Sequence, residues 1–464
     1  MNIHPQTSEA FQLLMKGTLA LARAERQGIR IDMEYVNRKK QQLTNKIENL
    51  EEEFRETQFF KDWQRSSRTP INIGSNPQLA KYLYEVKGIK IQKETKTGKG
   101  STDEKALKQM GIPELDYLIK IGQLEKIRDT YLDGYTREQV DGYLHPFFNL
   151  NTVVTYRSSS SQPNFQNIPK RDEYAMQTVR SAMFPRPGHQ LLEIDYSGVE
   201  VRINGAINQD KNLIRYINDP TTDMHRDVAI QLFKLDEYDE KIEGHKLLRQ
   251  AAKNGFVFPQ FYGDWYKSCT ENVACNWGEL PKSKWKAGQG VRLNGGTISD
   301  HLISKGITSF EQFTQHLKVM EADLWQNRFP EYAKWKDLYF AKYQKTGYID
   351  LLTGFRCQGV MNKKQVCNYP GQNGGFMCLL WSFIEADRIM VEEQWDTKLI
   401  GQIHDSILLD VLPSELDHVV KTLYRITCRD LPKAWKWLNV PLDIDMELCK
   451  VDQPWSKKEK YKFK

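Results

Sequence analysis

The sequence has no long hydrophobic run and no recognisable secretion signal. Its longest apolar stretch, Phe376 to Ile384, is interrupted by Ser382 and is shorter than the about 20 residues that a membrane-spanning helix needs. The N-terminus has no basic region followed by an apolar one, so it does not have the pattern of a signal peptide. We therefore expect a soluble, cytoplasmic protein that does not enter a membrane.

Paired cysteines and metal-binding spacings are also missing. The seven cysteines are odd in number and scattered, and no zinc spacing occurs among them. This usage is typical of reduced thiols in a cytosol and excludes a disulfide framework. The cysteines are Cys269, Cys275, Cys357, Cys367, Cys378, Cys428 and Cys449.

The composition suits a large protein with a polyanionic partner. A chain of 464 residues is too long for one simple core and should fold as two to four subdomains. The formal net charge of +6 is a mild excess of base, which favours a nucleic acid only weakly because many soluble proteins are as basic. The 11 tryptophans and 21 tyrosines are more suggestive, since aromatic rings among lysines and arginines can stack on bases.

Two distant stretches each bring an aspartate to the end of a predicted strand. In residues 191–202 an apolar run ends at Asp195 and passes into a helical pattern, which predicts Asp195 at the open end of a buried strand. In residues 399–411 two apolar runs flank His404 and Asp405, which predicts a hairpin with Asp405 at its tip. Aspartates on neighbouring strand ends can hold two Mg²⁺ ions roughly 3.5–4 Å apart, as in phosphoryl transfer. The pattern indicates a nucleotidyl transferase.

Both stretches resemble the first and last catalytic motifs of the A-family DNA polymerases, the group of bacterial DNA polymerase I and many phage replicases. The resemblance runs in order through nearly the whole chain, over five separate motifs. It implies an α+β protein with the right-hand polymerase fold, which has a helical thumb, helical fingers and an antiparallel-sheet palm. The implied division is 1–145 for the thumb with a palm lead-in, 146–210 for the first palm part, 211–365 for the fingers with an insertion near 264–310, and 366–464 for the second palm part.

The resemblance also implies the catalytic centre. Asp195 and Asp405 would be the catalytic residues and would bind two Mg²⁺ ions with the backbone carbonyl of Tyr196, with Mn²⁺ able to take their place. Ser406 stands where the family usually has glutamate, and we expect this difference to modify activity without abolishing it. Glu200 stands where the family has a glutamate that crowds the 2′ position of the sugar, which implies a preference for deoxynucleotides. Gly198 replaces the usual glutamine.

A predicted helix carries two cations toward a triphosphate. Arg249 and Lys253 lie four residues apart, so they share one helix face and can both meet negative charge, although an exposed cationic surface would have the same spacing. Tyr262, followed by glycine, completes the family's fingers motif. His225 resembles the histidine that touches the incoming triphosphate.

The fingers motif departs from the family in its length. From Lys253 to Tyr262 is nine residues where the family usually has eight, and Pro259 falls in what should be a helix interior. The helix must therefore contain a bulge or break before Tyr262. In the family, one position of this helix packs on the incoming base. Counting back from Tyr262 places that position at Phe258, whereas counting forward from Lys253 places it at Val257. We predict Phe258, because a base needs a flat partner.

Several polar residues match family positions that contact the primer-template duplex. Residues 155–169 are too polar for a core, and serine-rich segments are usually plain loops, but this one resembles the segment that lines the duplex. Tyr156 stands there where the family commonly has glycine. Gln372 lies in a predicted turn before a buried helix that starts at Gly375. The predicted DNA contacts are Arg157, Asn164, Gln166, Arg180, Gln372 and His404, of which Arg180 and Gln372 would donate into the minor groove.

The N-terminal part resembles the family's thumb. Residues 9–28 and the segment from Val36 to Phe54 have the apolar spacing of two helices, which could form a pair packed on itself or part of the thumb. Lys93, Lys96 and Lys99 lie in a glycine-containing loop that would suit phosphate contact, or would be a plain solvated loop. A thumb that begins near residue 9 leaves no room for a proofreading exonuclease, and the pair Asp32 and Glu34 is better explained as a helix start.

The expected partners are primer-template DNA and deoxynucleoside triphosphates, with an exonuclease or processivity factor supplied by a separate chain. The segment 264–310 has the weakest resemblance and is interpreted as a surface insertion or an extra contact to template. The lysine-rich tail from Ser456 should be frayed. The rival functions are a single-subunit RNA polymerase, a reverse transcriptase, or a catalytically silent duplex-binding protein that keeps the fold. Glu200 and the Tyr262 motif argue against the RNA polymerase, and the intact charged residues argue against the silent protein.

Overall fold

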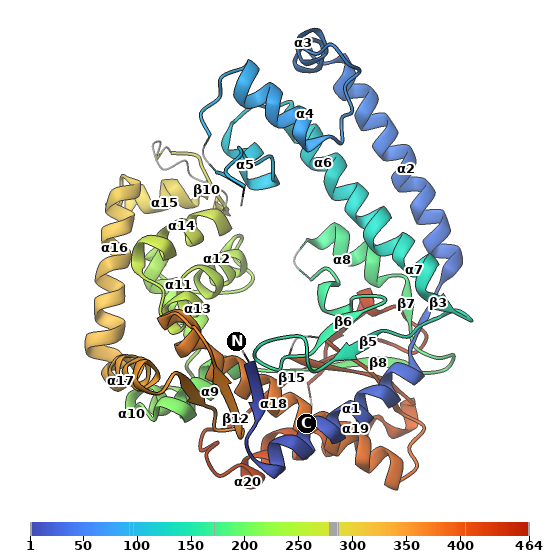
Figure 1. Cartoon of the computed structure of the whole chain (residues 1–464), viewed down its shortest axis with the longest axis vertical. Helices are drawn as coiled ribbons and strands as arrows, with labels where there is room; N and C mark the ends of the chain where they lie inside the picture. Colours follow the sequence, from blue (N-terminus) through green and yellow to red (C-terminus); the bar gives the residue numbers. More distant parts are fainter. Residues whose placement is uncertain are drawn as a thin grey trace.

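The computed structural model describes residues 2–91, 93–95, 97–170, 172–277, 285, 287–403 and 405–462. A base containing the main β-sheet supports two helical projections, which rise on opposite sides (Figure 1). We call residues 33–138 the helical arm and residues 201–332 the helical lobe. The space between the two projections opens above the sheet (Figure 1).

The main sheet has five strands in the order β13-β14-β8-β15-β16, and each pairing is antiparallel. Its central strand, β8, is built from a nearly continuous apolar run, as expected for a strand covered on both faces. The antiparallel sheet predicted for the palm is confirmed. The strands are β8 (Gln190–Tyr196), β13 (Lys398–Ile403), β14 (Ser406–Val411), β15 (Ile444–Leu448) and β16 (Glu459–Lys460).

Three helices of the base are α1 (Ser8–Gln27), α18 (Lys363–Glu392) and α19 (Leu416–Arg425). Helix α1 packs on α18 and β13, whereas α2 of the arm packs on α6. Of the two alternatives given for these segments, a helix pair packed on itself is therefore not what the structure has. The expected start of a helix at Gly375 is wrong. Helix α18 begins at Lys363 with Asn362 and Gln365 in a capping box, and it continues through Pro370.

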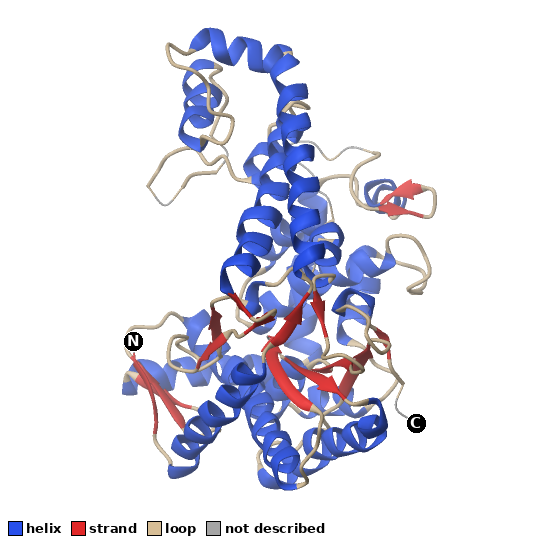
Figure 2. Cartoon of the chain, turned by 90° about the vertical axis from the view of Figure 1, so that its right-hand side faces the viewer, coloured by secondary structure: helices blue, strands red, loops and turns tan. Residues whose placement is uncertain are grey.

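The helical arm is a long antiparallel pair with a cap of short helices. Helix α2 starts at the cap residue Asp32, whose carboxylate accepts from the backbone N–H of Tyr35 at 2.9 Å, so the predicted helix start is confirmed. The pair rises from the sheet and its tip bends over to one side (Figure 2). The arm contains α2 (Met33–Glu56), α3 (Gln58–Ser66), α4 (Asn76–Ala80), α5 (Glu104–Gln109), α6 (Leu115–Glu125) and α7 (Asp133–Glu138).

The helical lobe has its own hydrophobic core, which extends from Val201 to Tyr332. Tyr343 and the residues that follow it join the core of the base, so the lobe ends earlier than the predicted boundary at 365. The lobe and its connection to the base contain α9 (Val199–Asn208), α10 (Lys211–Asn218), α11 (Met224–Phe233), α12 (His245–Ala252), α13 (Phe258–Phe261), α14 (Tyr266–Asn276), α15 (Ile298–Ser304), α16 (Phe310–Ala322) and α17 (Pro330–Thr346).

The segment predicted as a surface insertion forms part of the lobe's core. Cys269, Val273 and Trp277, on or just after α14, are fully buried. A Cβ atom added to Gly255 would lie 2.6 Å from Cγ2 of Val273, so α14 approaches the backbone of the preceding helix closely. A short hairpin of β9 (Arg292–Leu293) and β10 (Gly296–Thr297) follows. The interpretation as a surface insertion is therefore wrong for the described part of this segment.

The C-terminal tail is docked on the main sheet and is not frayed over its described residues. Strand β16 pairs with β15, and Trp455 is buried. Lys458 forms ion pairs with Glu193 and Glu447. Buried, paired side chains fix this end of the chain in place, so the sequence-based expectation of a loose tail is wrong.

Smaller sheets complete the structure. Strand β1 (Asn2–Pro5) joins β11 (Tyr348–Asp350) and β12 (Phe355–Gln358) across almost the whole length of the chain. The remaining strands and helices are β2 (Ile29–Ile31), β3 (Gln139–Val140), β4 (Tyr143–Leu144), β5 (Phe147–Asn149), β6 (Ser159–Ser161), β7 (Met183–Phe184), α8 (Glu173–Arg180) and α20 (Leu431–Ala434). Each helix of the described residues is too short or too polar to cross a membrane.

Candidate active site

Asp195 and Asp405 meet at one end of the main sheet. Asp195 lies near the end of β8, directly opposite Ser406, which is the first residue of β14. The backbone N–H of Tyr196 donates to the carbonyl of Asp405 at 3.4 Å, so the strand end and the hairpin turn are in direct contact. The structure therefore brings together the two aspartates that the sequence predicts as neighbours, although about two hundred residues separate them in the chain.

The surroundings of Asp195 disfavour an unpaired negative charge. Burial raises the pKa of Asp195 to about 6, Lys170 acts in the opposite direction, and the neighbouring Asp405 adds to the rise. The ammonium Nζ of Lys170 lies 3.6 Å from Oδ2 of Asp195. A dication would relieve the same unfavourable charge.

The oxygen donors at this sheet end fit Mg²⁺ or Mn²⁺. Carboxylate and carbonyl oxygens are the ligands that these hard cations prefer, and Mg²⁺ is usually held by one or two carboxylates together with water and phosphate oxygens. Among the described residues, no group of three or more histidine, cysteine or acidic side chains is arranged to hold a metal.

A charged chain of contacts links the sheet end to the lobe. The Nη2 atom of Arg157 lies 2.8 Å from Oε1 of Glu200 and 3.5 Å from Oδ1 of Asp405. The hydroxyl of Tyr262 donates to the other carboxylate oxygen of Glu200. Burial raises the pKa of Glu200, and Arg157 acts against that rise. Residues from distant segments of the chain thus share one network.

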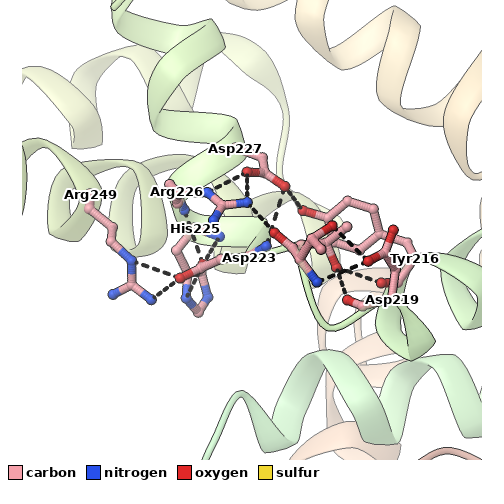
Figure 3. Close-up of polar contacts among 9 residues, drawn as sticks. Tyr216, Asp219, Asp223, His225, Arg226, Asp227 and Arg249 are labelled. Atoms are coloured by element: carbon pink, nitrogen blue, oxygen red, sulfur yellow. Dashed lines mark hydrogen bonds and ion pairs between the residues drawn. The ribbon is translucent and has the colours of Figure 1, made fainter. Parts of the chain in front are cut away.

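Arg249 and His225 lie around a carboxylate at the start of α11 (Figure 3). The guanidinium of Arg249 donates twice to Oδ2 of Asp223, from Nε at 3.1 Å and from Nη2 at 2.6 Å. Asp223 is also the N-cap of α11 and accepts from the backbone N–H of His225 at 2.9 Å. Gly198, Asp223, His225 and Arg249 line a cavity of about 160 Å³. This cavity lies beside the end of β8.

His225 is buried and neutral. Burial lowers its pKa to about 3, and the positive charges of Lys253 and Arg249 act in the same direction. Its Nε2 atom has no hydrogen-bond partner in the described part of the chain. An unpaired buried nitrogen is costly, so a ligand oxygen or proton donor that reached it would be stabilised.

We call the continuous helical run from His245 to Phe261, which carries Arg249 and Lys253, the cationic helix. Its extra residue is absorbed by a π-helical turn over Lys253–Val257. Of the two alternatives that the nine-residue spacing left open, a bulge or a break before Tyr262, the structure has the bulge. Pro259 follows directly after this π-helical turn, as the second residue of α13. The π-helical turn decides which of the two candidate side chains is accessible. Val257 is buried at 1% exposure, whereas Phe258 is only partly buried.

Phe258 stands among the other predicted nucleotide-binding residues. Its ring stacks on Tyr262 with centroids 5.9 Å apart and planes 18° apart. The Lys253 ammonium lies 5.3 Å from the Phe258 centroid, and the His225 ring meets it edge-on at 5.6 Å. Lys253, His225, Phe258 and Tyr262 therefore form a single cluster, as the sequence predicted for a nucleotide site.

The predicted DNA-binding residues have different surroundings. Arg157 is in the charged network beside Asp405, and the side-chain amide of Gln166 donates to Oε1 of Gln402 at 2.9 Å, on the strand that leads to the hairpin turn. Asn164 precedes a short 3-10 helix, and Gln372 lies within α18 and not in the predicted turn. His404 lies outside the described residues.

Arg180 is not available to DNA in this structure. Its side chain is 1% exposed, its Nε donates to the carbonyl of Pro169 at 3.1 Å, and its guanidinium lies 4.0 Å from the Trp455 ring centroid. Glu193 is 3.8 Å away. Arg180 therefore holds the C-terminal tail against the sheet, and the predicted minor-groove contact is not supported.

Tyr156 and Gly198, two of the residues that differ from the family pattern, both have a left-handed backbone conformation. Tyr156 stands where the family commonly has glycine, and it keeps a left-handed backbone with φ of 57°. Its ring packs on Phe355 with centroids 4.8 Å apart. Gly198, at the N-terminus of α9, has φ of 59°, a conformation that glycine adopts without strain.

Sequence reasoning missed three charged residues of the site. Lys170 contacts Asp195, Asp223 binds Arg249, and Asp445 lies directly opposite Asp195 on β15. Asp223 had a detectable signal, because an aspartate before an apolar helical pattern is a common N-cap. The other two depend on loop position and strand register, which the local sequence does not reveal.

The chain has the right-hand polymerase fold. Over 96% of this chain and 70% of the other, the structure is similar to the POL domain of Pol1 from M. smegmatis, solved in complex with DNA primer-template and dNTP, with a TM-score of 0.73 and 22% identity. The model of DNA polymerase family A matches residues 33–279. The chain belongs to that family.

Curated relatives cover most of this chain. DNA polymerase I of Bacillus subtilis is 26% identical over 442 residues, which are 94% of this chain and 44% of the relative. A thermostable DNA polymerase I of Thermus thermophilus is 32% identical over 442 residues, which are 92% of this chain and 46% of the relative. The chain thus spans about half the length of these relatives.

Proposed function

We propose that this chain is a template-directed DNA polymerase that adds deoxynucleotides to the 3′ end of a primer. The observation that carries the proposal is the contact between the ends of β8 and the β13–β14 hairpin, which holds Asp195 beside Asp405. Membership of DNA polymerase family A supports the same activity. The base would be the palm, the helical lobe the fingers and the helical arm the thumb.

In the proposed reaction, two Mg²⁺ ions, or Mn²⁺ in their place, would be held by Asp195, Asp405 and the backbone carbonyl of Tyr196. When bound, such ions lower the pKa of the primer 3′ hydroxyl and neutralise charge on the attacking and leaving oxygens. Arg249 and Lys253 bind the triphosphate and stabilise the negative charge that develops on it. His225 is neutral, so its free Nε2 can hydrogen-bond a phosphate oxygen or a metal-bound water without a change of charge.

The cluster around Phe258 would hold the incoming base and sugar. Phe258 is partly accessible and offers a flat face for stacking, worth about 1–3 kcal/mol per base. Glu200 is fixed between Arg157 and Tyr262, so it cannot easily swing away from a sugar placed against it. We propose that Glu200 crowds the 2′ position and selects deoxynucleotides.

The duplex would lie between the arm and the lobe, above the sheet. Arg157, Asn164, Gln166 and Gln372 are the proposed contacts, and His404 remains a prediction. Lys93 and Lys99 at the arm tip would contact phosphates, although Lys93 is ion-paired with Asp103 here. Lys96, from the same predicted loop, lies outside the described residues. A separate exonuclease or processivity factor, the absence of proofreading, and a cytoplasmic location in a bacterial or phage-infected cell also remain predictions.

A primer-extension assay with each dNTP and each rNTP, on DNA and RNA templates, tests the function. We expect extension with dNTPs on a DNA template and no shortening of a mismatched primer when nucleotides are withheld. Glu200→Ala should raise rNTP incorporation relative to dNTP incorporation by about tenfold or more, because it removes the side chain that is proposed to crowd the 2′ hydroxyl. Duplex binding without any extension would instead identify the catalytically silent alternative.

A further inference from the structure

A lysine that sequence reasoning did not select stands at the proposed metal site. Lys170 lies between the 3-10 helix of residues 165–167 and α8, and it reaches over the end of β8. Its Nζ is 3.6 Å from Oδ2 of Asp195, with side-chain exposures of 54% and 37%. Because both side chains are partly exposed and lysine has a flexible stem, the contact can break without disturbing the core.

Positive charge lies near each proposed metal ligand. The charge of Lys253 also acts on Asp195, but the lysine that forms an ion pair with Asp195 is Lys170. Arg157 lies beside Asp405, and Lys170 lies beside Asp195. Arg249 is engaged by Asp223 and is therefore not the partner of either aspartate. The side chain of Ser406, which lies next to Asp195 across the strand pair, brings no charge because its hydroxyl donates to the carbonyl of Ile403 at 2.8 Å.

These contacts leave Lys170 as the more readily displaced of the two cations. Arg157 is held by two carboxylates at once, those of Glu200 and Asp405, and its side chain is 31% exposed. Within the described ranges of the chain, Lys170 forms one ion pair, at a longer distance than the 2.8 Å between Arg157 and Glu200. A divalent cation that binds Asp195 would repel the ammonium at this distance and take over its role.

We propose that Lys170 is a built-in counter-ion for Asp195, which neutralises this carboxylate in the free chain and is displaced when a divalent cation binds. Lys170 thereby sets the metal concentration that the site requires. The inference rests on the proposed function, because it takes Asp195 as a metal ligand. The metal site would then have two kinds of residue: those that hold the metal, and Lys170, which regulates its binding.

The size of the effect follows from the exposure of the pair. Partly exposed ion pairs make small contributions, and these are screened by salt. Loss of this competition should therefore tighten metal binding by about two- to fivefold at low ionic strength, and by less as salt is raised. The charge-conserving change Lys170→Arg should leave metal binding close to that of the unaltered chain.

Binding of Mn²⁺ to the full chain, without DNA or nucleotide, tests this inference by the loss of the free-ion electron paramagnetic resonance signal. We expect Lys170→Gln to bind Mn²⁺ about two- to fivefold more tightly, and Lys450→Gln, which removes an exposed lysine elsewhere, to have no effect. In an Asp195→Asn background, Lys170→Gln should change nothing. Circular dichroism would confirm that each variant is folded.

Three outcomes would overturn the inference: unchanged or weaker Mn²⁺ binding by Lys170→Gln, an equal gain in the Asp195→Asn background, or no measurable Mn²⁺ binding by either protein. Primer extension by the same proteins separates this inference from the proposed function. Normal extension without any Lys170 effect overturns the counter-ion alone. Tighter Mn²⁺ binding by Lys170→Gln in a chain that never extends a primer overturns the polymerase activity alone.

Discussion

At the scale of single residues, Asp195 is maintained at a cost to the stability of the fold. Burial and the nearby Asp405 raise its pKa to about 6, although Lys170 opposes this shift. A carboxyl whose pKa is higher in the folded chain than in the unfolded chain destabilises the fold wherever it is charged. The destabilisation is present above pH 6, decreases as the pH falls through 6, and vanishes near the unfolded pKa of about 4.

We therefore predict that Asp195→Asn stabilises the metal-free protein. The side chain is 37% exposed, so solvent screening reduces the expected gain in the free energy of unfolding to about 1 kcal/mol at pH 8. The gain should disappear near the unfolded pKa of about 4. Urea unfolding in EDTA measures it, with Asp417→Asn as a control because that side chain is 85% exposed. A variant that is less stable than the original chain at pH 8 would refute this account of Asp195.

Phe258 gives a second prediction at this scale. Phe258→Ala should raise the KM for each dNTP by about tenfold, because stacking on a base is worth about 1–3 kcal/mol, whereas Phe258→Tyr should retain most of the affinity. Single-nucleotide insertion kinetics measure both values. Trp265→Ala is a suitable control, since that ring is 54% exposed and lies just beyond the cluster. Equal KM values for Phe258→Ala and the original chain would exclude the stacking role.

The sequence identified those site residues whose signal is local. Asp195 and Asp405 follow apolar runs, and Arg249 and Lys253 have helical spacing, so each was predictable. Arg180 was misinterpreted because its surroundings come from Trp455, far along the chain in the C-terminal tail. Lys170 was missed because no local pattern shows that a loop passes over the end of a strand.

At the scale of elements, the attachment of the lobe's cationic helix depends on a buried lysine of α17. The Lys336 ammonium donates to the carbonyl of Gln260 at 3.3 Å and lies 3.2 Å from the Trp325 ring centroid. The Tyr332 hydroxyl donates to the next carbonyl, that of Phe261, at 3.0 Å. Helix α17 thus fixes the end of α13, immediately before Tyr262 enters the site.

Lys336 makes the stability of this attachment depend on pH. Burial lowers its pKa to about 7, below the value of an unfolded lysine. The unfolded chain binds more protons between about pH 7 and 10, so stability should rise with pH across this window, and the full cost is present below pH 7. Lys336→Met should therefore raise the free energy of unfolding by about 2 kcal/mol at pH 7, with a smaller gain at pH 9.

Thermal and urea unfolding of Lys336→Met at both pH values measure this prediction. Lys334→Met, which changes another lysine on the same helix that is less buried, should behave like the original chain. Destabilisation at pH 7 that persists at pH 9 would show that the hydrogen bond to Gln260 outweighs the cost of burying the charge. Either result reports on how firmly α17 holds the cationic helix.

The sequence predicted the local features of helices, such as a capped start, better than it predicted which other elements those helices pack against. The capped start of α2 and the bulge in the cationic helix were both recognisable, because capping and spacing are local properties. The packing of α1 on the base and the burial of α14 depend on long-range contacts. The start of α18 was placed too late because Pro370 normally marks a helix boundary, whereas here it lies inside a largely buried helix.

At the scale of the whole molecule, the site is assembled from segments that are far apart in the sequence. Strand β8 and the β13–β14 hairpin supply the aspartates from the base, while the lobe supplies Tyr262 and the cationic helix. The arm and the lobe rise on either side of this centre (Figure 1). The proposed chemistry would therefore take place at the floor of the space between the two projections.

The most direct test of this account compares primer extension and duplex binding by the full chain with those of Asp195→Asn and Asp405→Asn. We expect the original chain to extend a DNA primer with dNTPs and each variant to lose about a thousandfold or more of that rate, because both aspartates are needed to hold the ions. Duplex affinity, measured by fluorescence anisotropy, should change by no more than about threefold, since neither aspartate is a proposed DNA contact. Extension at the normal rate by either variant would contradict the proposed catalytic centre.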